Sequence, residues 1–129
     1  METVEKKKLT LEDLIAKKTE KEHKRNATEP FYVASLDGEI GLTVPEEEVI
    51  FKTMDLLEDE DFSNILKTYS YLIYNSVPIL RNPELHRAYD VVDPLDIVPK
   101  LFDIKERVQL GEQLLKMTGL DELGNDVKN

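Results

Sequence analysis

Apolar positions along the chain change their spacing several times, and each change predicts a different element. Near the start, Leu11, Leu14 and Ile15 follow helical spacing, after which the next ten residues are almost wholly polar or charged. Thr10 followed by Asp13 matches a capping box, which favours a helix start at this point. We therefore expect an N-terminal helix whose apolar stripe is only about two turns long.

Two runs with strand character follow this helix. Residues 31–36 are aromatic and β-branched at their start, and residues 39–44 alternate apolar with polar positions. The Asp37-Gly38 pair between the runs is typical of a turn, so the pattern predicts a β-hairpin. Because a lone hairpin is only marginally stable in water, we expect it to pack on helices or to pair with another chain.

The rest of the chain has helical patterning interrupted by prolines. The strongest segment covers residues 62–77, whose apolar side chains occupy much of the helix circumference, so we expect it to be the central helix. Asn82, Asp93 and Asp103 stand where N-caps belong, and Gly119 stands where a C-terminal glycine belongs. Further helices are predicted from Pro45 to about residue 57, over 83–89, over 95–102 and over 104–118.

Together these elements predict an α+β protein that is predominantly α-helical. Its order is an N-terminal helix, one β-hairpin and then a bundle of four to five helices. A chain of 129 residues has room for one domain. We expect an N-terminal polar arm and helix over 1–28, a single compact domain over 29–120 and a polar tail over 121–129.

The net charge of −10 is distributed unevenly. Residues 1–28 hold eight basic and six acidic residues, for a charge of +2, whereas residues 29–129 hold nine and twenty-one, for a charge of −12. The acidic body would repel phosphate backbones, which argues against nucleic acid as a partner. The longest uncharged run, from Thr68 to Leu80, is too short to span a membrane, and no signal-peptide pattern is present. We expect a cytoplasmic protein.

The residues that usually carry chemistry are sparse. The chain has no cysteine, and His23 and His86 have no partner at metal-ligand spacing. The acidic runs at 46–48 and 58–61 have the character of helix caps and solvated faces. We therefore assign no catalytic residue, no cofactor and no metal site, and we do not expect an enzyme. A carboxylate pair that only the fold would assemble is an alternative that the sequence leaves open.

Three tyrosines fall on the predicted central helix. Tyr69 belongs to its apolar face, whereas Tyr71 points almost opposite and Tyr74 points to the flank. If the helix is covered on one side only, the last two are exposed aromatic residues of the kind that binding surfaces use. In the alternative, a second helix layer covers them. The candidate partner-binding residues are Leu11, Leu14, Ile15, Tyr71 and Tyr74.

An ordered set of segments carries a family resemblance. The segments are LTLEDLIAKK (9–18), FYVASLDGEIGL (31–42), YLIYNSV (71–77), NPELHRAY (82–89) and DPLDIVPKLFD (93–103), followed by a final helix. In this order they resemble the tail assembly chaperones of PBSX-type Bacillus prophages and of related contractile-tailed phages. The resemblance covers about residues 9–120, and its most specific part is residues 73–102.

The resemblance implies a function without catalysis. Such chaperones coat the tape measure protein, keep it soluble while tail tube subunits polymerise around it, and are absent from the mature virion. The expected partners are therefore the tape measure protein, tail tube subunits, a frameshifted longer form of the chain itself and further copies of it in a homo-oligomer. A second hypothesis is an acidic inhibitor or adaptor of the DNA-mimic type that binds a host protein. Such a mimic requires acids spaced regularly on one face, whereas here they cluster at helix starts and turns.

Overall fold

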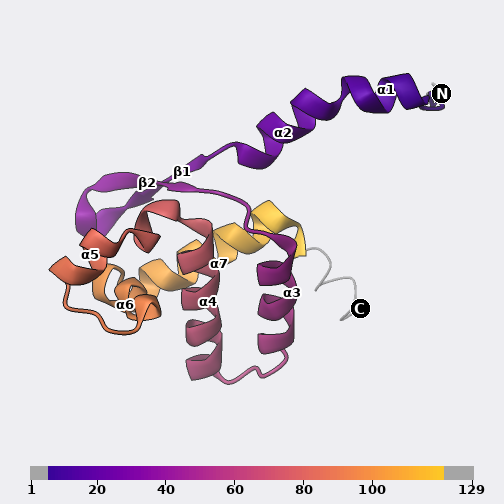
Figure 1. The fold of residues 1–129 in the computed structure, drawn as a ribbon. Helices are drawn as coiled ribbons and strands as arrows, with labels where there is room; N and C mark the ends of the chain where they lie inside the picture. Colours follow the sequence, from indigo (N-terminus) through magenta and orange to yellow (C-terminus); the bar gives the residue numbers. More distant parts are fainter. Residues whose placement is uncertain (1–5, 121–129) are drawn as a thin grey trace.

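The computed structural model describes residues 6–120 and confirms the predicted α+β architecture. An N-terminal arm consists of helices α1 (Leu11–Ala16) and α2 (Lys18–Asn26), and a hairpin of β1 (Glu29–Val33) and β2 (Gly38–Leu42) follows. Five α-helices then complete the body (Figure 1). They are α3 (Glu47–Leu56), α4 (Phe62–Ser76), α5 (Pro83–Ala88), α6 (Ile97–Leu101) and α7 (Ile104–Thr118). The predicted tail over 121–129 and the first five residues of the predicted arm lie outside the described residues.

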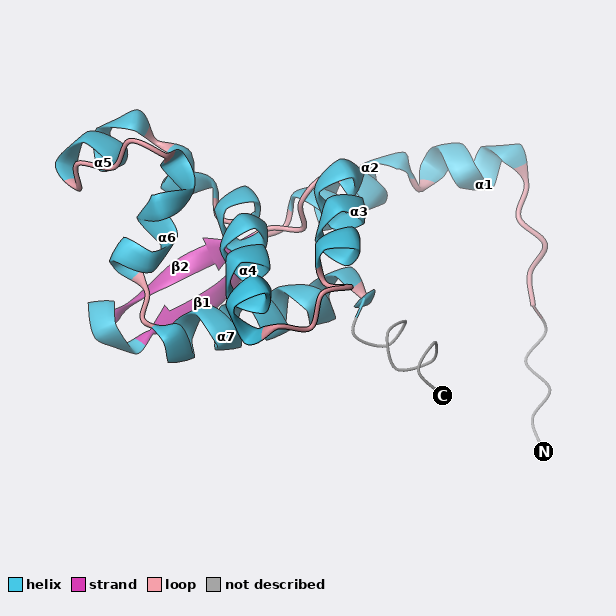
Figure 2. Cartoon of the chain, turned by 90° about the horizontal axis from the view of Figure 1, so that it is seen from below, coloured by secondary structure: helices cyan, strands magenta, loops and turns pink. Residues whose placement is uncertain are grey.

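The arm begins with the predicted capping box. The Thr10 hydroxyl accepts a hydrogen bond from the Asp13 backbone N–H at 3.2 Å, and the Asp13 carboxylate accepts one from the Thr10 N–H at 2.9 Å. The helices α1 and α2 meet at Lys17, whose backbone stays near the helical region, so the arm forms one bent helix. Neither helix contains a buried residue. Figures 1 and 2 show the arm projecting away from the body.

The hairpin differs from the prediction at its turn. The antiparallel register pairs Val33 with Gly38, so the loop contains four residues and β1 ends three residues before the predicted limit at Leu36. Residues 34–36 form a 3₁₀ turn, η1, and Asp37 adopts a left-handed conformation with φ of +48°. The strand stops because the Ser35 N–H donates to a carboxylate of α7 instead of to a partner strand.

The core lies where α4 crosses α7, with the hairpin, α3 and α6 around it. Prediction of α4 as the central helix is confirmed for its C-terminal half, where Leu72, Ile73 and the following Val77 are fully buried. At the other end Phe62, the first apolar residue of the segment predicted as the central helix, is 56% exposed. The remaining buried apolar side chains are Val33, Leu42, Leu80, Ile97, Val98, Phe102, Leu110 and Leu114.

Most predicted helix ends are confirmed. The side chains of Asn82, Asp93 and Asp103 each accept a hydrogen bond from a backbone N–H in the first turn, and Gly119 ends α7 with φ of +78°. Asp93 caps a 3₁₀ turn at Pro94–Asp96, η3, which leads directly into α6. The predicted start of α3 at Pro45 is wrong by two residues. The N-cap there is Glu46.

Candidate protein-binding surface

The apolar stripe of the arm is fully available to a partner. Leu11, Leu14 and Ile15 are 73%, 57% and 63% exposed, and Leu9 just before the helix is 58% exposed. Their positions differ by three and four residues, so the three helical side chains lie on one face. These residues are the first group of binding residues predicted from the sequence, and the described residues 6–120 leave more than half of each side chain exposed.

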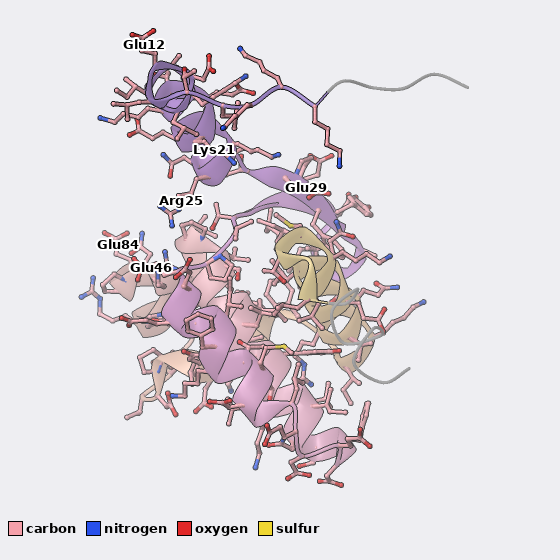
Figure 3. All side chains as sticks on the ribbon, turned by 90° about the vertical axis from the view of Figure 1, so that its right-hand side faces the viewer. Glu12, Lys21, Arg25, Glu29, Glu46 and Glu84 are labelled. Carbon is pink, nitrogen blue, oxygen red and sulfur yellow. The ribbon has the colours of Figure 1, made fainter. Side chains whose placement is uncertain are left out.

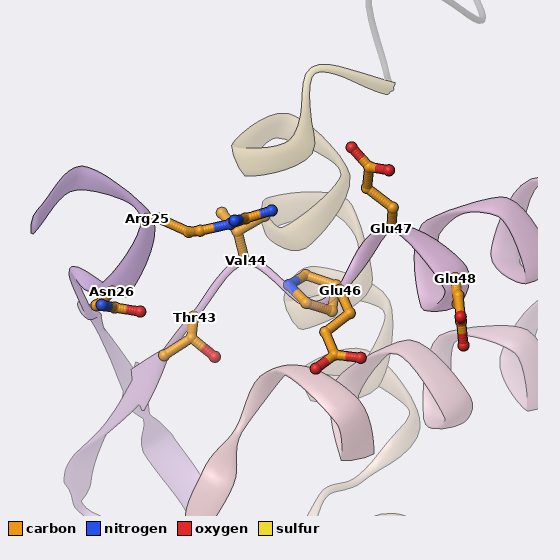
Figure 4. Close-up of a pocket in the computed structure, with 8 residues that line it drawn as sticks. Arg25, Asn26, Thr43, Val44, Glu46, Glu47 and Glu48 are labelled. Carbon is orange, nitrogen blue, oxygen red and sulfur yellow. The ribbon is translucent and has the colours of Figure 1, made fainter. Parts of the chain in front are cut away.

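A cleft separates the end of the arm from the start of α3. Its volume is about 660 Å³, with Arg25 and Asn26 on one side and residues 43–48 on the other. Figure 4 shows Arg25 extending over Val44 toward the acidic residues, and Figure 3 places it on the side of the arm that faces Glu46. This arrangement sets a positive group of the arm opposite a negative helix start, which favours the observed orientation of the arm.

The second group of predicted binding residues is partly covered. The Lys52 ammonium of α3 lies over the Tyr71 ring, 4.9 Å from its centroid. Tyr74 packs against the core and stacks on His86 of α5, with ring centroids 6.1 Å apart. The His86 ring nitrogen also hydrogen-bonds the Leu80 carbonyl oxygen at 2.6 Å. Side chains of α3 and α5 therefore cover part of the surface of Tyr71 and Tyr74. These two tyrosines and the apolar stripe of the arm do not form one continuous surface.

An apolar groove on the body was missed by the sequence analysis. It has a volume of about 460 Å³ and lies between the hairpin turn, α5, α6 and a 3₁₀ turn at Pro78–Arg81, η2. Eight of its ten lining residues are apolar. Ile79 and Leu36 stand at its rim, 64% and 47% exposed, and Phe102 lies at its base, 1% exposed. The only sequence signal was Ile79 itself, an apolar residue in the short segment between Pro78 and Asn82.

A buried glutamate holds the rim of this groove in place. The Glu106 carboxylate of α7 accepts hydrogen bonds from the Ser35 N–H at 3.0 Å and from the Ser35 hydroxyl at 2.7 Å, and from the Asp103 N–H at 3.1 Å. Burial acts to raise the pKa of Glu106, but these hydrogen bonds outweigh it and hold the pKa below the usual 4.5. The ionised carboxylate therefore fixes the turn that carries Leu36.

A second body cavity has charged side chains in its lining. It has a volume of about 520 Å³ and is lined by residues of α4, η3, α6 and α7, including Lys67, Asp93, Asp96 and Arg107. The Arg107 Nε is buried without a hydrogen-bond partner, although two acidic residues line the same cavity. Over residues 6–120, no group of three or more histidine, aspartate or glutamate side chains is placed to hold a metal ion.

Comparisons of the chain with models of protein families, with curated proteins and with solved structures found no match. No helix among residues 6–120 is both long enough and apolar enough to cross a membrane. The candidate site is therefore defined by geometry alone. It consists of an exposed apolar stripe on a projecting arm, an apolar groove on the body and single exposed aromatic side chains such as Phe51, which is 63% exposed.

Proposed function

We propose that this protein is a phage tail assembly chaperone that binds the tape measure protein and keeps it soluble while the tail tube assembles. The resemblance of residues 9–120 to that family supports the proposal. The observation that carries it is the arm, a bent helix on which every apolar side chain of α1 except Ala16 is more than half exposed. Side chains of this kind are suited to contacts with other protein chains.

The chemistry of such a client matches these surfaces. A long helical client presents apolar stripes, and amphipathic helices bind through anchors spaced three and four residues apart. The stripe of the arm and the exposed Phe51 and Phe62 offer apolar contacts at separate places on the molecule. The charge of −12 on residues 29–129 opposes nonspecific aggregation, so a complex with an apolar client stays dispersed.

Co-expression with the tape measure protein encoded nearest to this chain tests the proposal. We expect the client to be insoluble alone, to become soluble in the presence of the chain and to copurify with it through a tag on either protein. The client remaining equally soluble alone, with nothing copurifying, would refute the proposal. Copurification of a host polymerase or nuclease instead would support the acidic-inhibitor hypothesis.

A matched pair of variants shows whether the arm contributes to this complex. Leu14→Asp places a charge in the stripe of the arm, whereas Val92→Asp places the same charge at a body residue that is 98% exposed. Because neither side chain is buried, both variants should fold. We expect Leu14→Asp to lose most of the copurifying client and Val92→Asp to retain it. Equal retention by the two variants would exclude a role for the stripe.

A further inference from the structure

The helix α1 lacks the contacts that normally stabilise so short an element. It has six residues and α2 has nine, and isolated helices shorter than about 12–15 residues are marginal in water. Most helical stability in proteins comes from packing of an apolar face, yet Leu11, Leu14 and Ile15 are each more than half exposed and α1 has no buried residue. Contact of this stripe with another surface would therefore stabilise α1.

The groove between the hairpin turn, α5 and α6 has the complementary shape and chemistry. It is concave and lined mainly by aliphatic side chains, with Ile79 and Leu36 projecting at the rim. Its only ionisable lining residue is Glu84, an acid. The acids of α1 are Glu12 and Asp13, of which Asp13 pairs with Lys7 at 3.2 Å, and the basic pair Lys17 and Lys18 follows the helix directly. A helix with apolar anchors at i, i+3 and i+4 is the form of ligand that such a groove accepts.

The arm cannot reach the groove of its own chain in this conformation. Figures 1 and 2 both place α1 at one end of the molecule, with α5 and α6 at the opposite end. The charges also favour contact between copies through the arm. Two complete copies, each of −10, repel each other at long range, but at close range an arm of +2 is attracted to a body of −12.

We propose that the arm of one copy docks, through Leu11, Leu14 and Ile15, into the Ile79–Leu36 groove of a second copy of this chain. The contact is heterologous, since it joins two different surfaces. Each bound copy still presents a free arm or a free groove, so the contact extends into an open chain or closes into a ring. The proposal concerns the chain alone and does not depend on the identity of any client.

The size of the contact predicts its strength. One short helix in one groove buries less than the standard interface of about 1,600 Å², and interfaces below about 1,200 Å² are weak or transient. We therefore expect the purified chain to be monomeric when dilute and to associate into dimers and larger species at high concentration. Sedimentation equilibrium over a wide concentration range measures this association.

Complementation between two variants is the sharpest test. Leu14→Glu makes the arm unable to dock, and Ile79→Glu makes the groove unable to accept an arm. Ile79 is 64% exposed, so this substitution should not disturb the fold. We expect each variant alone to associate at least about tenfold more weakly than the unmodified chain, because each puts a charge into an apolar contact. An equimolar mixture should form a 1:1 dimer and nothing larger, because only one arm and one groove remain intact.

Val92→Glu is the control for added charge and should associate like the unmodified chain. Circular dichroism spectra that match the unmodified chain establish that the variants are folded. Three outcomes would overturn the proposal: an unmodified chain that stays monomeric at millimolar concentration, an Ile79→Glu variant that associates normally, or a mixture that forms no dimer. Normal association of Ile79→Glu with loss only in Leu14→Glu would identify pairing between two arms instead.

Discussion

The ring of Tyr69 in α4 lies directly against the backbone of Gly111 in α7. A Cβ atom added to Gly111 would lie 2.8 Å from Cδ1 of the ring, and closer still to Cγ and Cδ2. The two longest helices of the body cross at this point, so the absence of a side chain at residue 111 sets how closely they approach. Burial raises the pKa of Tyr69, and the charge of Glu112 raises it further.

Gly111→Ala should destabilise the protein even though alanine favours helices. Alanine in place of a helical glycine gains about 1 kcal/mol, but forcing a methyl group into a packed contact costs about 1–3 kcal/mol. Because rigid ring atoms oppose the methyl group, the cost should lie at the upper end of this range, for a net loss of up to about 2 kcal/mol in the free energy of unfolding, measured by urea denaturation. Gly41→Ala is the control, since its added Cβ meets only ordinary contacts with Thr28.

Glu106 should make the stability of the protein sensitive to acid. Its pKa in the folded protein lies below its usual 4.5, so the unfolded state binds more protons as the pH falls. The contribution of Glu106 is therefore fully present above pH 4.5 and is lost as the pH falls through the folded value. Denaturation midpoints measured from pH 7 downward should decline in this window.

The Glu106→Gln variant distinguishes the contribution of this carboxylate to acid sensitivity from the contributions of the other acidic residues. We expect the variant to lose about 1–3 kcal/mol at neutral pH, because an amide cannot accept all the hydrogen bonds from Ser35 and Asp103. Its stability should also decline less steeply in acid. Glu112→Gln, at an exposed position of the same helix, should behave like the unmodified chain. An unchanged acid profile in Glu106→Gln would contradict this assignment.

The same substitution at two phenylalanines should have very different effects. Phe102 is 1% exposed and packs in the core, so Phe102→Ala should cost about 3–5 kcal/mol. Phe51 is 63% exposed, and Phe51→Ala should change the free energy of unfolding by only about 0.5 kcal/mol. Thermal and urea denaturation of the two variants would measure the loss of stability in each and show that Phe102, but not Phe51, belongs to the core.

The arm should be dispensable for folding of the body. No side chain from residue 6 to residue 27 is buried, and deletion of residues 1–27 keeps the hydrogen bond from Gln113 Nε2 to Glu29 Oε1. We expect the midpoint of urea unfolding to stay close to that of the full chain, while association at high concentration disappears. A large loss of stability would show that the arm belongs to the cooperative unit and would contradict the predicted division at residue 28.

Features with local physical causes could be predicted from the sequence. The Thr10 capping box, the Asp103 N-cap and the Gly119 helix end depend on residues within one turn of each other, so their signals are contiguous in the chain. The hairpin was recognised for the same reason. Its turn was predicted incorrectly because Ser35 is held by Glu106, which lies 71 residues away.

The candidate surface was predicted only where it is local. The stripe of the arm follows from the spacing of Leu11, Leu14 and Ile15, and the structure leaves it exposed. The groove combines side chains from four separate segments, and no periodicity in one segment reports on such a set. Tyr71 and Tyr74 could not be placed from the sequence, because their exposure depends on where α3 and α5 pack.

The long span between Ser35 and Glu106 has a consequence for biosynthesis. A ribosome adding about 5–20 residues per second needs roughly 4–14 s to reach Glu106 after it has made Ser35. During this interval the nascent hairpin lacks the Glu106 carboxylate that holds its turn and the α7 side chains Leu110 and Leu114 of the shared core, so the core around Val33 and Leu42 is incomplete. The newly made chain itself thus passes through an aggregation-prone stage, and slower translation would prolong it.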